Sequence, residues 1–401
     1  MNNNWKKNII LFLTSQTISL FGSMLVQYAI TWYITLKTQS GVMMTISIIC
    51  DFLPTFLLSP FAGVWADRYD RKKLIILSDS IIAIATLILS ILFFMGYDAI
   101  WLFFVAASIR ALGSGIQTPV VGAFLPQLVP EDKLTKVNAV NSSIQSLIML
   151  ISPMLSGALL TMSAMGIIFF IDVITAVIAV FILLLFLHVP AHAKALQKQS
   201  TAYFSDMKEG LKYIKNHGFI KILFFFIAIF FILSAPLSFL TSLHVTRSFG
   251  NEVWRLTAVQ ITFSVGMMLG GVMAASWGGF KNKVHTLIIS ILIIGAGTFA
   301  LGAISFFWVY TFLMCFIGLV LTFLDTQFVA LLQSEAEEDF LGRIFGVLGM
   351  IQSIIMPAAM LIYGPLADYV KIDLIFMGVG LLIFILSILM LGNKNMLWNN
   401  I

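Results

Sequence analysis

Apolar runs long enough to cross a bilayer as helices follow one another along almost the whole chain. Six runs precede a polar stretch over 188–218 and six follow it. The first six lie near Ile9–Leu36, Gly41–Trp65, Leu74–Met95, Ile100–Leu125, Val140–Met162 and Gly166–Leu187. The second six lie near Phe219–Val245, Leu256–Trp277, Val284–Ile304, Phe307–Leu332, Ile344–Ala367 and Ile372–Leu391. This pattern predicts an all-α membrane protein with two six-helix bundles, 1–187 and 219–401.

The polar stretch 188–218 contains a pattern typical of an amphipathic helix. Phe204, Met207, Leu211 and Ile214 recur at helical spacing, with charged residues between them. A cytoplasmic linker with a helix lying on the membrane surface is one interpretation. We favour the simpler alternative, in which the helix packs on the inner ends of the spans.

Composition supports the membrane interpretation and excludes other classes. Of the 401 residues, 60% are hydrophobic and 10% are charged, whereas roughly a quarter are charged in soluble globular proteins. The net charge of +5 does not indicate nucleic-acid binding, because the basic residues lie between apolar runs and form no separate domain. Cys50 and Cys315 both lie inside apolar runs, so we expect neither a disulfide framework nor a metal site.

The distribution of basic residues predicts the orientation. With the amino terminus inside, cytoplasmic segments hold 18 of the 23 Lys and Arg residues and outer segments hold four. This bias fits the positive-inside rule and places both termini in the cytoplasm. The first apolar run is too long for the core of a signal peptide, so we expect it to be the first span.

The loop between the second and third runs carries a distinctive motif, Gly63-Val-Trp-Ala-Asp-Arg-Tyr-Asp-Arg-Lys-Lys73. It resembles the pattern G-x-x-x-D-[RK]-x-G-[RK]-[RK] of the major facilitator superfamily. The matching positions are Gly63, Asp67, Arg68, Arg71 and Lys72, and Asp70 replaces a glycine. The resemblance implies a transporter fold in which this loop is a conformational gate. Its basic residues would then bridge the inner ends of the two bundles, and Asp67 would lie near the positive end of a second-half helix. Enforcing topology is a compatible role.

Charged residues inside apolar runs are costly, so each is a functional candidate. Four stand out in the predicted spans: Asp51, Arg110, Asp172 and Asp325. Asp51 and Arg110 are both expected near the midplane, about 15 Å from the outer surface at the rise of an α-helix. We expect them to face one aqueous cavity, where a carboxylate can take up a proton or a cation; a static ion pair between the two helices is the alternative.

The other charged residues have competing interpretations. Asp172 suits a helix-fixing hydrogen bond as well as transport, and Asp325 is expected to anchor the inner gate or the acidic loop that follows it. Asp79, near the inner end of the third run, is expected to pair with the basic loop. The segment from Arg110 to Gly115 resembles the R-x-x-x-G motif that this superfamily associates with proton handling, although its glycines are displaced to Gly113 and Gly115.

Two further patterns favour export. Ser152, Pro153 and Gly157 belong to a segment that resembles the G-P-x-x-G-G motif of drug–proton antiporters, with serine in place of two glycines. Polar residues on helical faces are cavity candidates, foremost Gln27, Tyr28, Gln117 and Gln145. Loops around Leu125–Asp132 and Leu341–Gly346 resemble those of bacterial macrolide-efflux permeases.

Together these resemblances predict a proton-coupled exporter of bulky hydrophobic or cationic compounds. An exporter of an endogenous metabolite, siderophore or lipid-like product is the alternative, and an uptake symporter is less favoured. We expect a monomer in the cell membrane whose partners are a small-molecule substrate, protons and lipid. No cofactor is expected. The chain lacks the phosphate-binding loop of an ATPase, so the energy for uphill transport is expected to come from an ion gradient, and the absence of common hydrolase motifs argues against an enzyme.

Overall fold

The computed structural model describes residues 5–162, 165–187, 189, 203–280 and 282–392, and every regular element in these ranges is helical. Twelve of the described helices are long and apolar enough to cross a membrane. The predicted all-α membrane fold is confirmed. The chain divides into two compact units, Met1–Ile34 with Ile46–Thr201, and Thr35–Thr45 with Ala202–Ile401.

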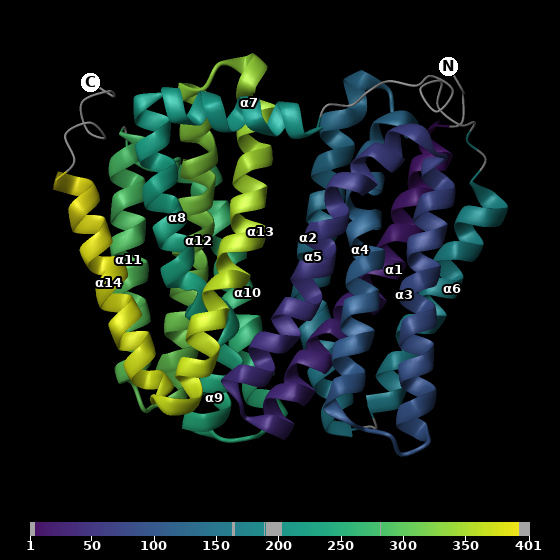
Figure 1. Cartoon of the computed structure of the whole chain (residues 1–401), viewed down its shortest axis with the longest axis horizontal. Coiled ribbons are helices and arrows are strands. Elements are labelled where there is room, and N and C mark those ends of the chain that lie inside the picture. The colour runs from purple at the N-terminus through teal and green to yellow at the C-terminus, as the bar shows by residue number, and fades with distance from the viewer. Residues whose placement is uncertain (1–4, 163–164, 188, 190–202, 281, 393–401) are drawn as a thin grey trace. The chain divides into compact units, whose positions relative to one another are not determined.

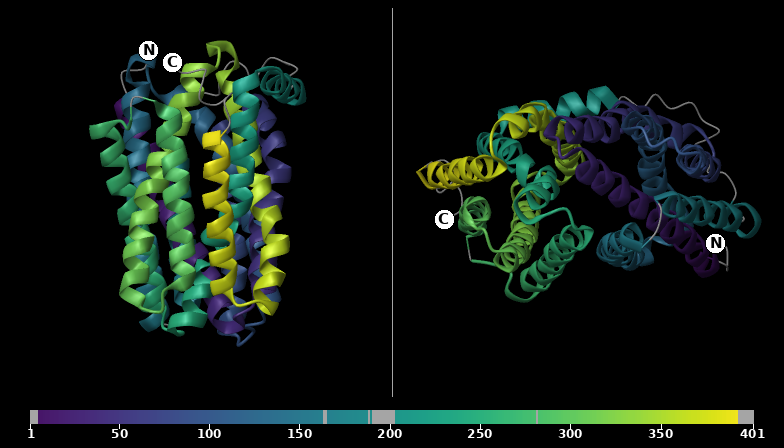
Figure 2. Two further views of the ribbon diagram at one scale, coloured as in Figure 1. Left: turned by 90° about the vertical axis from the view of Figure 1, so that its left-hand side faces the viewer. Right: turned by 90° about the horizontal axis from the view of Figure 1, so that it is seen from below.

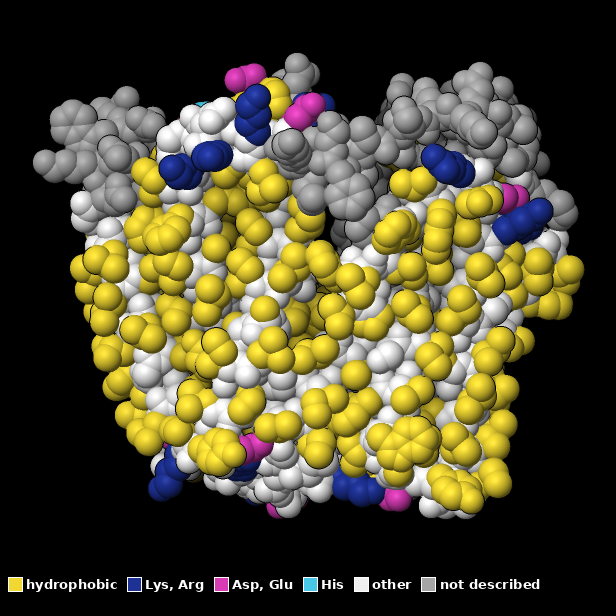
Figure 3. Space-filling model, viewed as in Figure 1, with side chains coloured by type: hydrophobic (Ala, Val, Ile, Leu, Met, Phe, Trp, Pro, Cys, Tyr) yellow, Lys and Arg dark blue, Asp and Glu magenta, His cyan; other side chains and the backbone are white. Residues whose placement is uncertain are grey.

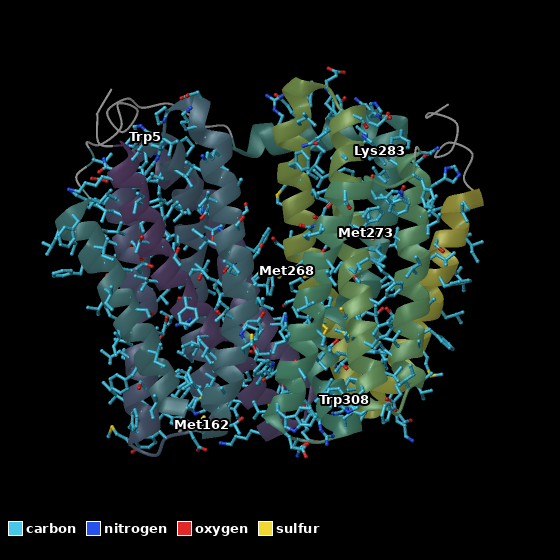
Figure 4. All side chains as sticks on the ribbon, turned by 180° about the vertical axis from the view of Figure 1, so that it is seen from behind. Trp5, Met162, Met268, Met273, Lys283 and Trp308 are labelled. Atoms are coloured by element: carbon cyan, nitrogen blue, oxygen red, sulfur yellow. The ribbon has the colours of Figure 1, made fainter. Side chains whose placement is uncertain are left out.

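The first unit is built from six long helices (Figure 1). They are α1 (Trp5–Thr38), α2 (Gly41–Arg68), α3 (Arg71–Phe94), α4 (Ile100–Leu128), α5 (Leu134–Met162) and α6 (Met165–Phe186), with a 3₁₀ turn at Glu131–Lys133. Helix α3 packs against both α4 and α6. Trp5 and Met162 lie at opposite ends of this unit, as five successive crossings require (Figure 4).

The second unit contains six further long helices and two short ones. The long helices are α8 (Gly218–Phe239), α10 (Val253–Trp277), α11 (Lys283–Ala303), α12 (Phe307–Glu335), α13 (Glu338–Tyr369) and α14 (Ile372–Gly392). The short helices are α7 (Tyr203–Asn216) and α9 (Thr241–Phe249). Helices α10, α11, α12 and α14 run side by side along their lengths (Figure 2). The end of α1 and the start of α2, Thr35–Thr45, pack as part of this unit.

Local signals in the sequence set several helix boundaries. Asp70 precedes α3 and its side chain accepts a hydrogen bond from the backbone N–H of Lys72, which satisfies one of the free donors at the helix start. Asn282 does the same for α11. Gly278 ends α10 in the left-handed conformation, with φ of 71°, where a side chain would be strained.

The linker helix α7 lies across one end of the second unit (Figure 1). The ring of Tyr213 stacks on Phe340 with centroids 4.4 Å apart, and Glu209 pairs with Arg343 at 3.2 Å. These contacts agree with the favoured interpretation of a helix packed on the ends of the spans. The rest of the linker, 190–202, lies outside the described residues.

One predicted span differs in detail from the structure. The run Phe219–Val245 is divided at Leu240 into α8 and α9. Pro236 precedes the break and removes one N–H from the helix ladder, which favours a change of direction there. Helix α9 buries Leu243, His244 and Val245 and is less apolar than α8.

Apolar side chains cover the flanks of both units. In each unit the visible Lys and Arg side chains gather at the ends, away from the broad apolar band (Figure 3). Ile174, Val177 and Phe181 of α6 and Leu382 and Leu389 of α14 are among the exposed members of these bands. Such surfaces suit lipid, so the chain is a multi-pass membrane protein.

Candidate functional site

An ion pair at the centre of the first unit joins α4 to α6. Arg110 donates from Nη1 to Oδ2 of Asp172, and the two side chains are 7% and 1% exposed. The same arginine donates to the hydroxyl of Thr86 on α3 and, at 3.1 Å, to the carbonyl of Ser23 on α1. Four helices therefore meet at one guanidinium group.

The partner carboxylate has further donors. Ser23 Oγ lies 3.3 Å from Asp172 Oδ1, and Thr86 Oγ1 lies 2.8 Å from Oδ2. Gly22 allows α1 to approach this point, because a Cβ there would lie 2.0 Å from Thr175 Oγ1. An ion pair with these hydrogen bonds on both partners offsets much of the desolvation that burial imposes.

Asp79 lies on α3, buried within the same unit with 1% of its surface exposed. Its Oδ1 accepts hydrogen bonds from Ser19 Oγ of α1 and Gln117 Nε2 of α4, each at 2.7 Å. Its Oδ2 is buried and has no hydrogen-bond partner among the described residues. The expectation that Asp79 pairs with the basic loop is therefore wrong, since its partners come from the interior of two neighbouring helices.

Asp51 lies on α2 and is held by an amide. Gln27 of α1 donates from Nε2 to Asp51 Oδ2 at 2.8 Å. The hydrogen-bonded ion pair of Arg110 is formed with Asp172, so the alternative in which Asp51 and Arg110 form a static pair is not what the structure holds. Asp51 is thus a half-buried carboxylate held by the neutral amide of Gln27.

The glycines after Arg110 explain how these helices come so close. A Cβ at Gly113 would lie 2.6 Å from Ile82 of α3, and one at Gly115 would lie 3.1 Å from the backbone of Thr55 on α2. Gly113 therefore lets α4 approach α3, within reach of Gln117 and Arg110, and Gly115 lets it approach α2.

The basic loop motif makes its described contacts inside the first unit. Arg71 donates to the carbonyls of Ala66 and Ala123, each at 2.9 Å, and Lys72 donates to that of Leu187 at 2.7 Å. These cations satisfy carbonyls at the ends of α2, α4 and α6, where the helix dipole is negative. Arg68 is exposed, Gly63 has open space beside it, and the side chain of Asp67 lies outside the described set.

The antiporter-like segment and the remaining cavity candidates are more dispersed. Ser152, Pro153 and Gly157 are all buried on α5, and the hydroxyl of Ser152 has no partner among the described residues. Tyr28 packs beside Trp32 with ring centroids 5.6 Å apart. Gln145 is exposed on α5. Of the four cavity candidates, Gln27 donates to the half-buried Asp51 and Gln117 to the buried Asp79.

In the second unit the ionic contacts among the described residues lie near helix ends. The Nε2 atom of His244, on α9, lies 2.7 Å from Oδ1 of Asp373. Its Nδ1 atom lies 3.1 Å from the hydroxyl oxygen of Tyr310. Burial lowers the pKa of His244, against the opposing effect of Asp373. A neutral ring with its proton on Nε2 satisfies both neighbours, because a carboxylate only accepts and the tyrosine hydroxyl can donate.

Asp368, near the end of α13, caps the start of α2. It accepts from the backbone N–H groups of Gly41 at 2.7 Å and Val42 at 3.0 Å, from Ser40 Oγ at 2.8 Å, and from Arg247 at 2.9 Å. A cavity of about 540 Å³ lined by Arg247, Asp368, Lys371 and Asp373 opens beside it. Asp325 of α12 is exposed and has no partner among the described residues, so no described contact anchors a gate or loop to it.

Three of these groups were missed in the sequence as functional candidates. Asp79 carried the same signal as Asp51, a charge inside an apolar run. Its position near the basic loop favoured an ion pair with that loop instead of a functional role. Asp368 follows Gly364 and Ala367 with the spacing that joins Asp67 to Gly63 and Ala66, and this repeat could have pointed to it. Asp373 had no comparable signal. No group of three potential metal ligands occurs among the described residues.

Comparison with protein families matches residues 12–360 to the Major Facilitator Superfamily. The chain is 29% identical over 388 residues to Macrolide efflux protein A of Streptococcus pyogenes, with 96% of each covered. It is also 29% identical over 320 residues to Macrolide efflux protein A of Enterococcus faecalis, covering 79% of this chain and 98% of that protein. The Staphyloferrin A transporter of Staphylococcus aureus is 26% identical over 209 residues, 51% of each chain.

Solved transporter structures share the fold. A POT family transporter in complex with a thioalcohol-conjugated peptide aligns with a TM-score of 0.73 and 15% identity over 96% of each chain. The nucleoside transporter NupG aligns with a TM-score of 0.68 and 14% identity, covering 97% of this chain and 98% of that one. At these identities the similarity shows the fold alone.

Proposed function

The chain belongs to the Major Facilitator Superfamily, and from this premise we propose that it is a proton-coupled antiporter that exports bulky hydrophobic or cationic compounds, such as antibiotics, by alternating access. The substrate is a small molecule and the energy comes from the proton gradient. Its place is the cell membrane, as a monomer with both termini in the cytoplasm. The identity to two macrolide efflux proteins supports a macrolide as the first substrate to test.

The observation that carries the proposal is the chemistry of Asp51. A half-buried carboxylate held by the neutral amide of Gln27 can be neutralised either by a proton or by an organic cation. Occupancy by one disfavours the other, because a second positive charge gains nothing from a carboxylate that is already neutral. Competition of this kind, combined with a change of access, exchanges the two across a membrane.

The loop motif has a mechanical part in this cycle. Arg71 and Lys72 hold the inner ends of α2, α4 and α6 together, so these ends move as one body. Asp67 and Arg68 are then the members left to form and release contacts with the second bundle, which biases the equilibrium between inward-open and outward-open states. The antiporter-like segment around Pro153 provides a bend and close helix contact in α5.

A second candidate is export of an endogenous siderophore-like product. The partial identity to the Staphyloferrin A transporter supports it. The two candidates share fold and energy source and differ only in the substrate.

Inside-out membrane vesicles from a host without its own exporters test the proposal. We expect an acidic lumen to drive accumulation of a radiolabelled macrolide, and a protonophore to abolish it. Asp51→Asn, which removes the charge and keeps the shape, should lose this accumulation, while the exposed Asp132→Asn serves as the matched control. Accumulation that ignores the protonophore contradicts proton coupling, and accumulation of a siderophore without the macrolide supports the second candidate.

A further inference from the structure

The buried carboxylates of the first unit differ in their partners. Asp172 is paired with Arg110, whereas Asp79 accepts only from neutral groups, the hydroxyl of Ser19 and the amide of Gln117. Both donors lie on Oδ1, and the buried Oδ2 has no partner among the described residues. An ionised carboxylate has about four acceptor sites, and two of them are satisfied here.

The charged groups around Asp79 do not neutralise it. From α4, Arg110 is engaged by Asp172 of α6, which is itself an acid and brings no positive charge to Asp79. From α1 the contact is Ser19, a hydroxyl. The basic residues of α3 lie more than one turn away at its start, where Arg71 and Lys72 donate to backbone carbonyls.

A buried negative charge without a cation is strongly disfavoured, and a proton on the unpartnered oxygen removes it. Resting on the antiport function proposed above, we infer that Asp79 is the residue that carries the transported proton, held on Oδ2, and that Asp51 is left to face the cationic substrate. This division keeps the proposed antiport but replaces direct competition at Asp51 by two separate sites, with the proton on Asp79 and the cationic substrate at Asp51.

The proton balance of the cycle is simple. Oδ2 takes one proton from water on the outer side and gives it to water on the inner side, which regenerates the carboxylate, and no other bond forms or breaks. While Asp79 is ionised, the bonds from Ser19 and Gln117 become charge-assisted and therefore stronger. Proton release thus draws α1 and α4 toward α3.

Helix α1 connects proton release from Asp79 to Asp51, the carboxylate that faces the substrate. It carries Ser19, the donor to Asp79, and about two turns later Gln27, the donor to Asp51. A displacement of α1 toward α3 therefore changes how Asp51 is held. Because α4 already lies close to α3 at Gly113, these two helices have little room to move relative to each other there.

Infrared difference spectroscopy of the purified full-length protein tests the protonation state. The wild type should show the carbonyl stretch of a buried protonated carboxylic acid, with its characteristic shift in heavy water. Asp79→Asn should lose this band, while Asp51→Asn and Asp132→Asn should keep it. A band that survives in Asp79→Asn overturns the inference.

Transport in proteoliposomes gives the second readout. Asp79→Asn, whose amide oxygen can still accept from Ser19 and Gln117, should retain exchange of labelled for unlabelled macrolide without a gradient and lose proton-driven accumulation. Accumulation equal to wild type overturns the inference. If Asp79→Asn does not fold, Gln117→Leu replaces it: losing a donor to the carboxylate should move the pH profile of transport to higher pH, and an unmoved profile counts against the inference. Failure of the wild type itself to accumulate substrate overturns the proposed antiport, while the infrared band still reports on Asp79.

Discussion

The two units of this protein place their ionic groups differently. In the first, Asp79, Arg110 and Asp172 lie well inside their helices and depend on one another or on neutral donors for stabilisation. In the second, the described ionic contacts lie near helix ends, as with Asp368 at the end of α13 and Asp373 at the start of α14. Charges at helix ends can reach water, whereas the buried charges of the first unit depend on internal partners. This difference is the reason why we propose proton coupling for the first unit.

The largest effect should follow from breaking the buried pair of the first unit. Arg110→Met leaves Asp172 as an uncompensated buried charge, which costs about 3–5 kcal/mol in comparable cases. The double variant Arg110→Met/Asp172→Leu removes both charges and should recover much of the loss. Thermal unfolding of the purified protein compares the stabilities of the two variants. If Arg110→Met is no less stable than the double variant, then Asp172 is not an uncompensated buried charge in the single variant, which contradicts this account.

Close helix packing in the second unit offers a test that involves no charge. A Cβ at Gly266 of α10 would lie 1.9 Å from the carbonyl oxygen of Cys315 on α12, where only backbone movement can make room. Gly266→Ala should therefore destabilise by about 1–3 kcal/mol. Gly271→Ala, on the same helix with open space beside it, is the control and should be neutral or slightly stabilising. Equal melting temperatures for the two variants would rule out the tight contact.

A smaller effect is expected at the end of the second unit. Asp368→Ala removes the cap from the start of α2 and the partner of Arg247, and loss of a helix cap costs about 0.5–2 kcal/mol. Ser40→Ala removes one of the donors to the same carboxylate and should cost less. Unfolding by denaturant ranks the two, and the reverse order would mean that Ser40, not Asp368, holds this end together.

The smallest effect concerns pH. Burial lowers the pKa of His244 below its ordinary value, so the unfolded chain binds more protons than the folded one once the pH falls below about 6.5. The stability of the second unit should be constant above this pH and decline below it. His244→Gln should flatten the decline in a series of melting curves; a wild type that becomes more stable on acidification would show that the ring is protonated when folded.

The sequence was sufficient for the fold because bilayer-length apolar runs dictate helices regardless of tertiary detail. It also identified Asp51, Arg110 and Asp172 as unusual, since a charge in an apolar run is visible without a structure. It could not pair them. The partner of Arg110 lies on α6, and the choice of Asp172 over Asp51 depends on how closely α3, α4 and α6 pack.

Residues that act through backbone contacts were harder to predict. The capping role of Asp368 depends on the N–H groups of Gly41 and Val42, which belong to a distant segment of the chain. Arg71 and Lys72 likewise bind carbonyls, and nothing in their side-chain chemistry says which ones. Such contacts form where helix ends from distant parts of the chain meet, so the local sequence around one residue does not predict them.

Proton movement driven by substrate is the most direct test of coupling through the first unit. Proteoliposomes with a trapped pH-sensitive dye are given a macrolide gradient and no proton gradient. The predicted result is a proton flux opposite to the substrate in the wild type, no flux in Asp79→Asn, and an unchanged flux in the control Asp132→Asn. Substrate movement without any proton flux in the wild type would contradict proton-coupled antiport.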